Sequence, residues 1–351
     1  MSDPEDEEPS GNVAIAPEPA PVLDNVPHPF DALTPDAVWS AIESAGYVCD
    51  GRMLALNSYE NRVYQVGIEE AEPLIAKFYR PDRWHRDQIL EEHAFALELQ
   101  DAELSVVAPL VSAEGRSLHD YGDFMFALFP RRGGHSPELD DPDTLQVLGR
   151  SLGKMHSIGA SKRFKYRQSL TLAGFGTTSR DYLLQHDFIP PELRAAYESL
   201  SRDLLQRVEA LFAHYAHVKP IRLHGDCHPG NILWRDDTAH FVDLDDCMSG
   251  PAVQDLWMLL AGPREQQLLQ LSELIEGYDM FHSFHPAELG LIEALRTLRL
   301  MHYAAWLARR WHDPAFPRSF PWFNTVRYWS QHILELREQL SALDEPPLVL
   351  Y

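Results

Sequence analysis

The feature that most constrains the fold of this sequence is a change of pattern near residue 130. Before it, short segments rich in β-branched and aromatic residues lie between turn signals and predict strands at 52–57, 62–68, 73–79, 105–111 and 123–130. Thr34 followed by Pro35 predicts a helix start ahead of these strands. Residues 86–100 have apolar positions at helical spacing. The chain up to residue 130 should therefore form a sheet with an inserted helix.

Beyond residue 130 the pattern is mostly helical. Helices are predicted at 144–159, 192–216, 253–262, 264–278 and 288–311, with one strand–turn–strand at 231–246. We therefore expect an α+β chain of two lobes: a small β-rich N-lobe with one key helix, residues 30–128, and a larger, mostly helical C-lobe, residues 129–351. Two lobes joined by a short apolar connection can form a ligand cleft between them.

Residues 1–29 differ from the rest of the chain. They are rich in Asp and Glu, contain no Lys or Arg, and have a proline every few residues. Such a segment buries too little apolar surface to offset the entropy cost of ordering it, so we predict that it is disordered. An acidic interaction arm is the alternative interpretation.

The charge and the cysteines of the chain exclude several classes of protein. Its net charge is -23, whereas non-specific nucleic-acid binding needs a clustered Lys/Arg surface. The same charge disfavours binding to an anionic membrane surface. Three cysteines, Cys49, Cys227 and Cys247, cannot form a disulfide framework, and the N-terminus has no signal-peptide pattern. We expect a cytoplasmic monomer that binds neither nucleic acid nor membrane.

Residues 223–231, LHGDCHPGN, gather side chains that can bind a metal or move a proton. His224, Cys227 and His228, with Cys247 as a fourth ligand, could hold zinc. Their spacing matches no zinc motif, however, and Pro-Gly within the segment breaks any helix there. His224 is better interpreted as holding the loop by hydrogen bonds, and Cys227 as a small buried side chain.

Asp226 and Asn231 have the D-x-x-x-x-N spacing of a kinase catalytic loop. In phosphoryl transfer an acidic residue orients and deprotonates the attacking hydroxyl, and oxygen ligands hold Mg²⁺. Asp226 is therefore the predicted base. The strand–turn–strand that follows should return Asp243 close to Asn231, so that these two side chains bind Mg²⁺. We count Asp243 with Asp226 among the catalytic residues.

A cation for the nucleotide phosphates is available on a predicted N-lobe strand. Lys77 is the single charge on that apolar strand, like the strand lysine of kinases, although a lone lysine often extends to solvent instead. Glu91 or Glu92 could pair with it. We prefer Glu92, because Phe95 and Leu99 place it beside the apolar face of its helix.

The turn at residues 56–64, LNSYENRVY, should cover the phosphates, with the Ser58 hydroxyl and backbone N–H groups as donors. It is not glycine-rich, so the G-x-G-x-x-G signature is absent. Asp255 is expected to accept backbone hydrogen bonds near the catalytic loop. Each of these features has a structural explanation when taken alone, and it is their order along the chain that favours a nucleotide site.

With these residues in this order, the sequence resembles the bacterial stress response kinase A family, within the aminoglycoside phosphotransferase and choline kinase-like group. The similarity runs from about residue 31 to 348. HGD-x-x-x-x-N indicates only the wide phosphotransferase group, whereas NSYENRVYQ and GPAVQDLWMLL are far more specific. The acidic segment 1–29 is longer than the family pattern, which leaves the choice of partner open.

The resemblance implies a bilobal protein kinase-like fold and an ATP-dependent, Mg²⁺-requiring serine/threonine protein kinase of the cytoplasm. Autophosphorylation and a role in stress survival are implied with it. ATP and an unidentified protein substrate are then the partners. Asp226 is implied as the base, Asn231 and Asp243 as magnesium ligands, and Ser58 as a nucleotide-site residue.

Two other functions share this fold. A small-molecule kinase acting on an amino alcohol, aminoglycoside or sugar would have every residue named above, so the motifs leave it open. A pseudokinase that binds nucleotide without turnover is disfavoured, because the lysine, the base and the metal ligands are all present.

Overall fold

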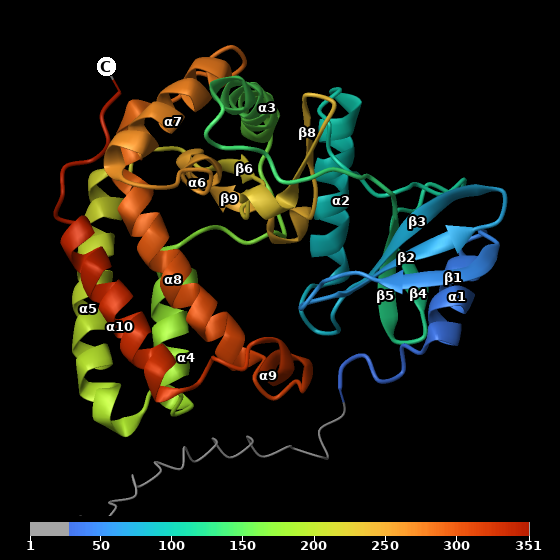
Figure 1. Cartoon of the computed structure of the whole chain (residues 1–351), viewed down its shortest axis with the longest axis horizontal. Helices are drawn as coiled ribbons and strands as arrows, with labels where there is room; N and C mark the ends of the chain where they lie inside the picture. Colours follow the sequence, from blue (N-terminus) through green and yellow to red (C-terminus); the bar gives the residue numbers. More distant parts are fainter. Residues whose placement is uncertain (1–27, 351) are drawn as a thin grey trace, which may run out of the picture.

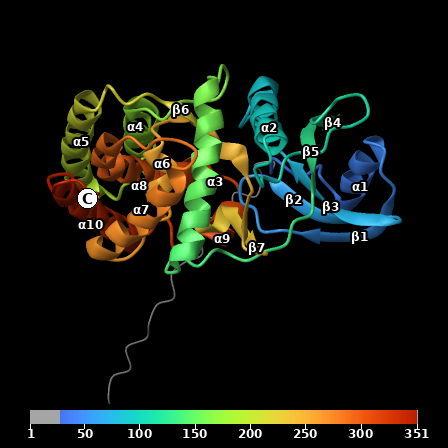
Figure 2. The same ribbon diagram turned by 90° about the horizontal axis from the view of Figure 1, so that it is seen from above.

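The computed structural model describes residues 28–350 and contains two lobes (Figure 1). In Figures 1 and 2 the N-terminal sheet and its two helices lie at one end of the molecule, and the remaining helices lie at the other end. The predicted bilobal α+β fold is therefore confirmed. The predicted disordered segment, residues 1–29, lies almost wholly outside the described residues. The lobe limits stay a prediction, since the last N-lobe strand ends at Pro130.

A five-stranded antiparallel sheet of order β1-β2-β3-β5-β4 forms the N-lobe. Its elements are α1 (Pro35–Ser44), β1 (Cys49–Ala55), β2 (Arg62–Ile68), β3 (Ala71–Phe78), α2 (Arg86–Asp101), β4 (His119–Tyr121) and β5 (Phe124–Pro130). The Thr34 hydroxyl caps α1 by accepting the N–H of Ala37, as predicted. The side chains of Ala76 and Phe78 point to the face of the sheet that α1 covers and pack in one hydrophobic core with residues of that helix. Because side chains alternate along a strand, Lys77 faces α2 instead.

One strand prediction is wrong. Residues 105–111 form only an isolated bridge between Val106 and Phe241, in which Val107 donates its N–H to the carbonyl oxygen of Phe241 (2.9 Å). Separately, Leu110 donates its N–H to the carbonyl oxygen of Leu128 (2.7 Å). This segment therefore ties the C-lobe to the sheet. Pro109 also lacks the N–H that a continuous ladder needs. The sheet edge is taken by β4, which was not predicted.

The C-lobe contains two hydrophobic cores, one around α3 and α7 and the other around α5, α8 and α10. Its helices are α3 (Pro142–Ser161), α4 (Thr178–Gln185), α5 (Pro191–His214), α6 (Val253–Trp257), α7 (Arg264–Tyr278), α8 (Ile292–Arg309), α9 (Ala315–Ser319) and α10 (Val326–Ala342). Its strands are β6 (Ile221–Leu223), β7 (Ile232–Arg235), β8 (Thr238–Phe241) and β9 (Met248–Gly250). Within residues 28–350, no helix has the length and apolar character to cross a membrane.

Several C-lobe elements differ from their predictions. α6 ends at Trp257 rather than at residue 262, and tighter turns follow it, in which Leu259 donates its N–H to the carbonyl oxygen of Leu256 and Leu260 to that of Trp257 (both 3.1 Å). α8 begins at Ile292, after a 3₁₀ segment over Pro286–Leu291, rather than at residue 288. α10, α4 and the β6–β9 pair were not predicted. The strand–turn–strand at 231–246 is confirmed as β7 and β8.

Glycines allow α3 and α7 to approach closely. A Cβ atom on Gly153 would lie 2.3 Å from the carbonyl oxygen of Tyr278, and one on Gly149 would lie 2.0 Å from that of Leu274. Both obstacles are backbone atoms, so a side chain here requires the helices to separate.

Gly153→Ala should lower the free energy of unfolding by about 1–3 kcal/mol, because overpacking against backbone outweighs alanine's better helix propensity. Urea unfolding followed by circular dichroism measures the change. Gly133→Ala is the matched control, since its Cβ would meet only the Arg235 side chain, at 3.9 Å. Equal stability of the two variants would contradict the prediction.

Candidate active site

A buried carboxylate holds the loop that follows β6. Asp255 of α6 is fully buried and accepts the backbone N–H groups of His224 (2.9 Å) and Gly225 (2.8 Å). Gly225 has a φ of 86°, and a Cβ there would lie 2.3 Å from the carbonyl oxygen of Asp246, so only glycine fits. The structural role predicted for Asp255 is confirmed.

The other two scaffolding predictions for this loop are also confirmed. His224 Nε2 lies 2.9 Å from the carbonyl oxygen of Val242, and Cys227 is fully buried. Within residues 28–350, no group of three or more His, Cys, Asp and Glu side chains is arranged to hold a metal ion.

Asp226 is held from two sides. Arg299 of α8 places Nη1 2.6 Å from Asp226 Oδ1, while Asn231 Nδ2 and His228 Nε2 lie 3.4 and 3.5 Å from Oδ2. Burial acts to raise the pKa of Asp226, but the hydrogen bond from His228 and the charge of Arg299 outweigh it and hold the pKa well below its usual range. Asp226 is therefore an ionised carboxylate whose Oδ2 is the less engaged oxygen.

The β7–β8 hairpin returns the chain beside Asn231. Val242 donates its N–H to the carbonyl oxygen of Asn231 (3.0 Å), so Asp243 follows directly. Asp243 has a φ of 59°, a left-handed conformation that aspartate tolerates better than most residues. The local prediction that the hairpin brings Asp243 close to Asn231 is confirmed.

Lys77 of β3 is buried at the junction of the lobes. Its Nζ lies 2.8 Å from Asp245 Oδ1, 2.9 Å from Asp243 Oδ1 and 3.9 Å from Glu92 Oε1. Burial alone would lower the pKa of Lys77, but Asp243, Asp245 and Glu92 outweigh it and raise the pKa well above its usual value. Burial raises the pKa of Glu92, because it outweighs the charge of Lys77, whose Nζ is 3.9 Å away. Lys77 thus joins the lobes.

Glu91, the alternative partner for Lys77, points elsewhere. Its carboxylate accepts the backbone N–H groups of Lys165 (2.6 Å), Tyr166 (2.7 Å) and Arg167 (2.7 Å). Arg167 in turn donates to the carbonyl oxygen of Cys247 (2.9 Å). Glu91 therefore fixes a C-lobe segment against α2, and Glu92 is the one that faces Lys77.

The loop between β1 and β2 carries Ser58, which is partly buried. Two neighbouring side chains, which sequence reasoning missed, fasten this loop to the C-lobe. Asn61 Nδ2 donates to Asp245 Oδ2 (2.7 Å), and the Glu60 carboxylate accepts from Trp306 Nε1 (2.8 Å). The loop predicted to cover the phosphates is therefore bound to both lobes.

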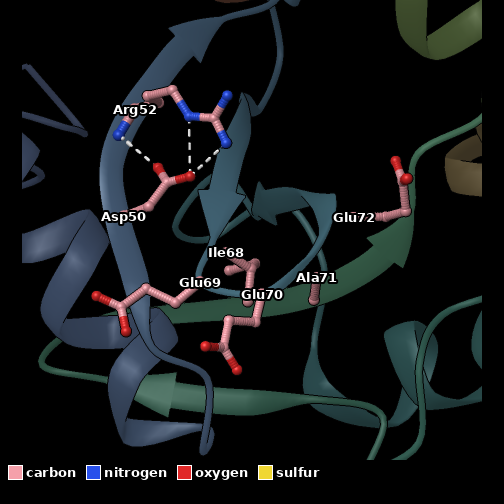
Figure 3. Close-up of a pocket in the computed structure, with 7 residues that line it drawn as sticks. All are labelled: Asp50, Arg52, Ile68, Glu69, Glu70, Ala71 and Glu72. Atoms are coloured by element: carbon pink, nitrogen blue, oxygen red, sulfur yellow. Dashed lines mark hydrogen bonds and ion pairs between the residues drawn. The ribbon is translucent and has the colours of Figure 1, made fainter.

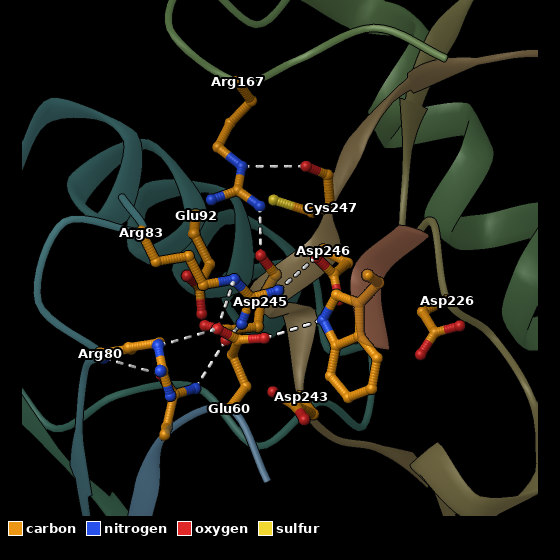
Figure 4. Close-up of polar contacts among 12 residues, drawn as sticks. Glu60, Arg80, Arg83, Glu92, Arg167, Asp226, Asp243, Asp245, Asp246 and Cys247 are labelled. Atoms are coloured by element: carbon orange, nitrogen blue, oxygen red, sulfur yellow. Dashed lines mark hydrogen bonds and ion pairs between the residues drawn. The ribbon is translucent and has the colours of Figure 1, made fainter. Parts of the chain in front are cut away.

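Asp245 and Asp246 were also missed, although they lie in the same FVDLDD segment as Asp243. Arg83 pairs with Asp245 (2.8 Å) and with Asp246 (2.7 Å), and Figure 4 shows both carboxylates surrounded by arginines, with Asp226 at the edge of the group. The run of three carboxylates was the one local signal for this network. No local sequence signal pointed to Arg299, because it is 73 residues from Asp226 in the sequence.

The donor set of Asn231 and Asp243 fits a hard cation. Asn231 Nδ2 donates to the carbonyl oxygen of Asp226 (2.9 Å), which leaves the amide oxygen available. Asp243 pairs with Lys77 through Oδ1, whereas Oδ2 has no hydrogen-bond or ion-pair partner among residues 28–350, and the side chain is 54% exposed. Amide and carboxylate oxygens are the ligands that Mg²⁺ and Ca²⁺ prefer.

A hollow elsewhere on the N-lobe does not belong to this site. It is lined by Asp50 and Arg52 of β1 and by the β2–β3 turn, residues 68–72 (Figure 3). Arg52 is paired with Asp50, so the remaining lining charges are acidic and exposed. None of the predicted site residues lines this hollow.

The fold and these residues are those of a phosphotransferase. Residues 53–292 match the phosphotransferase enzyme family. The chain is 45% identical over 328 residues to stress response kinase A of Escherichia coli, which covers 93% of this chain and 99% of that protein. It is 44% identical over 321 residues to the serine/threonine protein kinase RdoA of Salmonella typhimurium, covering 92% and 97%. The chain therefore belongs to the stress response kinase A family of phosphotransferases.

A solved structure of the same fold is a kinase of a small molecule. Amicoumacin kinase, in complex with AMP-PNP, Ca²⁺ and Ami, superimposes with a TM-score of 0.66 at 20% identity, over 88% of this chain and 94% of that one. At this identity the likeness concerns the fold alone. The molecule that receives phosphate from this kinase must therefore be inferred from the residues of this chain.

Proposed function

We propose that this chain is an ATP-dependent serine/threonine protein kinase of the cytoplasm that acts in stress survival and also phosphorylates itself. The observation that carries the proposal is the 2.9 Å contact between Lys77 of the N-lobe and Asp243 of the C-lobe, next to the loop of Asp226. It joins a phosphate-binding cation to a metal-binding carboxylate at one point between the lobes. The 44% identity to the serine/threonine protein kinase RdoA, over 92% of this chain, supports a protein acceptor.

In the proposed reaction, the oxygen of a Ser or Thr hydroxyl forms a bond to the γ-phosphorus while the bond from that phosphorus to the β–γ bridging oxygen breaks. Asp226 Oδ2 accepts the hydroxyl proton, and ADP leaves. Lys77 donates to the nucleotide phosphates. Glu92 limits the movement of that lysine, and the loop of Ser58 covers the phosphates with its hydroxyl and backbone N–H groups.

Mg²⁺ is the proposed metal. Asn231 through its amide oxygen and Asp243 through Oδ2 would hold it, together with phosphate oxygens of ATP. When bound, the ion neutralises charge that develops on the phosphates. The fold of the described residues leaves the Asn231 amide oxygen and Asp243 Oδ2 without protein hydrogen-bond donors, so both can bind a metal.

Labelled ATP should place phosphate on Ser and Thr residues of this protein and of added protein substrates. The matched panel contains amino alcohols, an aminoglycoside and a sugar, which are acceptors of the alternative function. Asp226→Asn prepared in parallel excludes a contaminating kinase. Label on small molecules alone, with none on protein, would contradict the proposed function.

A further inference from the structure

One face of α8, continued by its C-cap residue Arg310, begins beside Asp226. Arg299, Tyr303, Trp306 and Arg310 recur at helical spacing and therefore share that face. Arg299 contacts Asp226 at its start, and Trp306 and Arg310 contact Glu60 of the β1–β2 loop at its other end. This stripe thus runs from the proposed base to the loop proposed to cover the phosphates.

Arg299 has donors to spare. A guanidinium carries several N–H groups in a planar fork, and among residues 28–350 only Nη1 of Arg299 has a partner, Asp226 Oδ1. The side chain is 42% exposed, and Tyr303, one turn further along, is 41% exposed. Because Oδ1 and Oδ2 belong to one carboxylate, groups that flank an acceptor hydroxyl at Asp226 Oδ2 would lie near these unused N–H groups.

Three arginines, Arg299, Arg309 and Arg310, lie along α8 or directly after it, although the net charge of the whole chain is -23. His302 of α8 lies close to these arginines: burial first, and then the charges of Arg309, Arg310, Arg299 and Arg83, lower the pKa of His302 to about 3. The nearby carboxylates Asp226 and Asp246 are themselves paired with arginines. A cation beside Asp226 would therefore lie next to the Arg299 guanidinium, whereas the unpaired Oδ2 of Asp243 is proposed to hold the metal.

We propose that Arg299 is a specificity-determining residue, which selects acceptor hydroxyls flanked by acidic groups and disfavours cationic acceptors. This inference rests on the proposed function and names the acceptor class for that site. A carboxylate near the acceptor hydroxyl would take the free N–H groups of Arg299 while the hydroxyl reaches Asp226 Oδ2. An ammonium group at the same place would be repelled by the guanidinium, as like charges are across an interface.

Two peptides with one serine each, identical except for acidic or lysine flanks, test the inference. For the wild-type protein, kcat/KM should favour the acidic peptide by about tenfold or more. Arg299→Glu should reverse that ratio, and Arg299→Lys should retain most of it because the charge remains. Arg202→Glu is the control, since it makes the same charge change on an exposed part of α5 and should leave the ratio unaltered.

The ratio is the deciding measurement, because removing Arg299 also alters the charge beside Asp226 and lowers turnover on both peptides. Arg299→Gln provides a neutral second variant, in which the preference should be nearly lost. Phosphorylation of both peptides with a ratio that no Arg299 variant changes would overturn this inference and leave the proposed function intact. Wild-type transfer to amino alcohols and to neither peptide would instead overturn the proposed function, and this inference with it.

Discussion

Asp226→Asn should reduce phosphoryl transfer by about a hundredfold or more while leaving ATP binding nearly unchanged. Asparagine has almost the same shape and can still accept from Arg299, so the loop that Asp255 holds should stay in place. It cannot accept the proton of the acceptor hydroxyl, and a positioned general base typically contributes about 10²–10⁴ in rate. ATP affinity should persist because Lys77, Asn231 and Asp243 are unchanged.

Single-turnover kinetics and nucleotide titration separate the two parts of this prediction. Asp203→Asn, on the exposed surface of α5, is the matched control and should behave as the wild type. Full transfer activity of Asp226→Asn would refute Asp226 as the base. A loss of ATP affinity equal to the loss of rate would indicate that Asp226 supports the nucleotide site rather than the proton transfer.

Asp243→Ala should weaken magnesium-dependent ATP binding by about tenfold or more, and lower transfer with it, because it removes the one carboxylate proposed to hold the metal. Lys77 still has Asp245 at 2.8 Å and Glu92 at 3.9 Å, so the lysine remains paired in the variant. The effect can therefore be attributed to the metal rather than to a displaced lysine.

Nucleotide titration at several magnesium concentrations measures this effect. Alanine is strained at the left-handed φ of Asp243, whereas asparagine tolerates it, so Asp243→Asn separates the loss of charge from backbone strain. Asp120→Ala, an exposed β4 residue paired with Arg86, is the control. An unchanged magnesium dependence in both Asp243 variants would count against Asp243 as a ligand.

Local sequence patterns predicted those parts of the site that short-range geometry determines. The D-x-x-x-x-N spacing and a tight hairpin are enough to bring Asp243 beside Asn231, because a two-stranded ladder fixes its own register. The prediction that Lys77 is the cation of the site, and the preference for Glu92 over Glu91 as its partner, also rest on neighbouring residues only. The error at residues 105–111 has the opposite cause, since a strand-like apolar segment there bonds to Phe241 of the other lobe.

By itself, the sequence determined the two-lobe α+β architecture and the residues proposed for phosphoryl transfer, because periodicity and spacing are local properties, and its resemblance to known kinases indicated the family. Only the tertiary structure decided which charges meet. Asn61 reaches Asp245 across 184 residues, and Arg299 reaches Asp226 across 73. Such pairs depend on how the two lobes and α8 pack, and buried ionic groups need a partner wherever that packing places them. The acceptor preference proposed for Arg299 could therefore be inferred only from the folded chain.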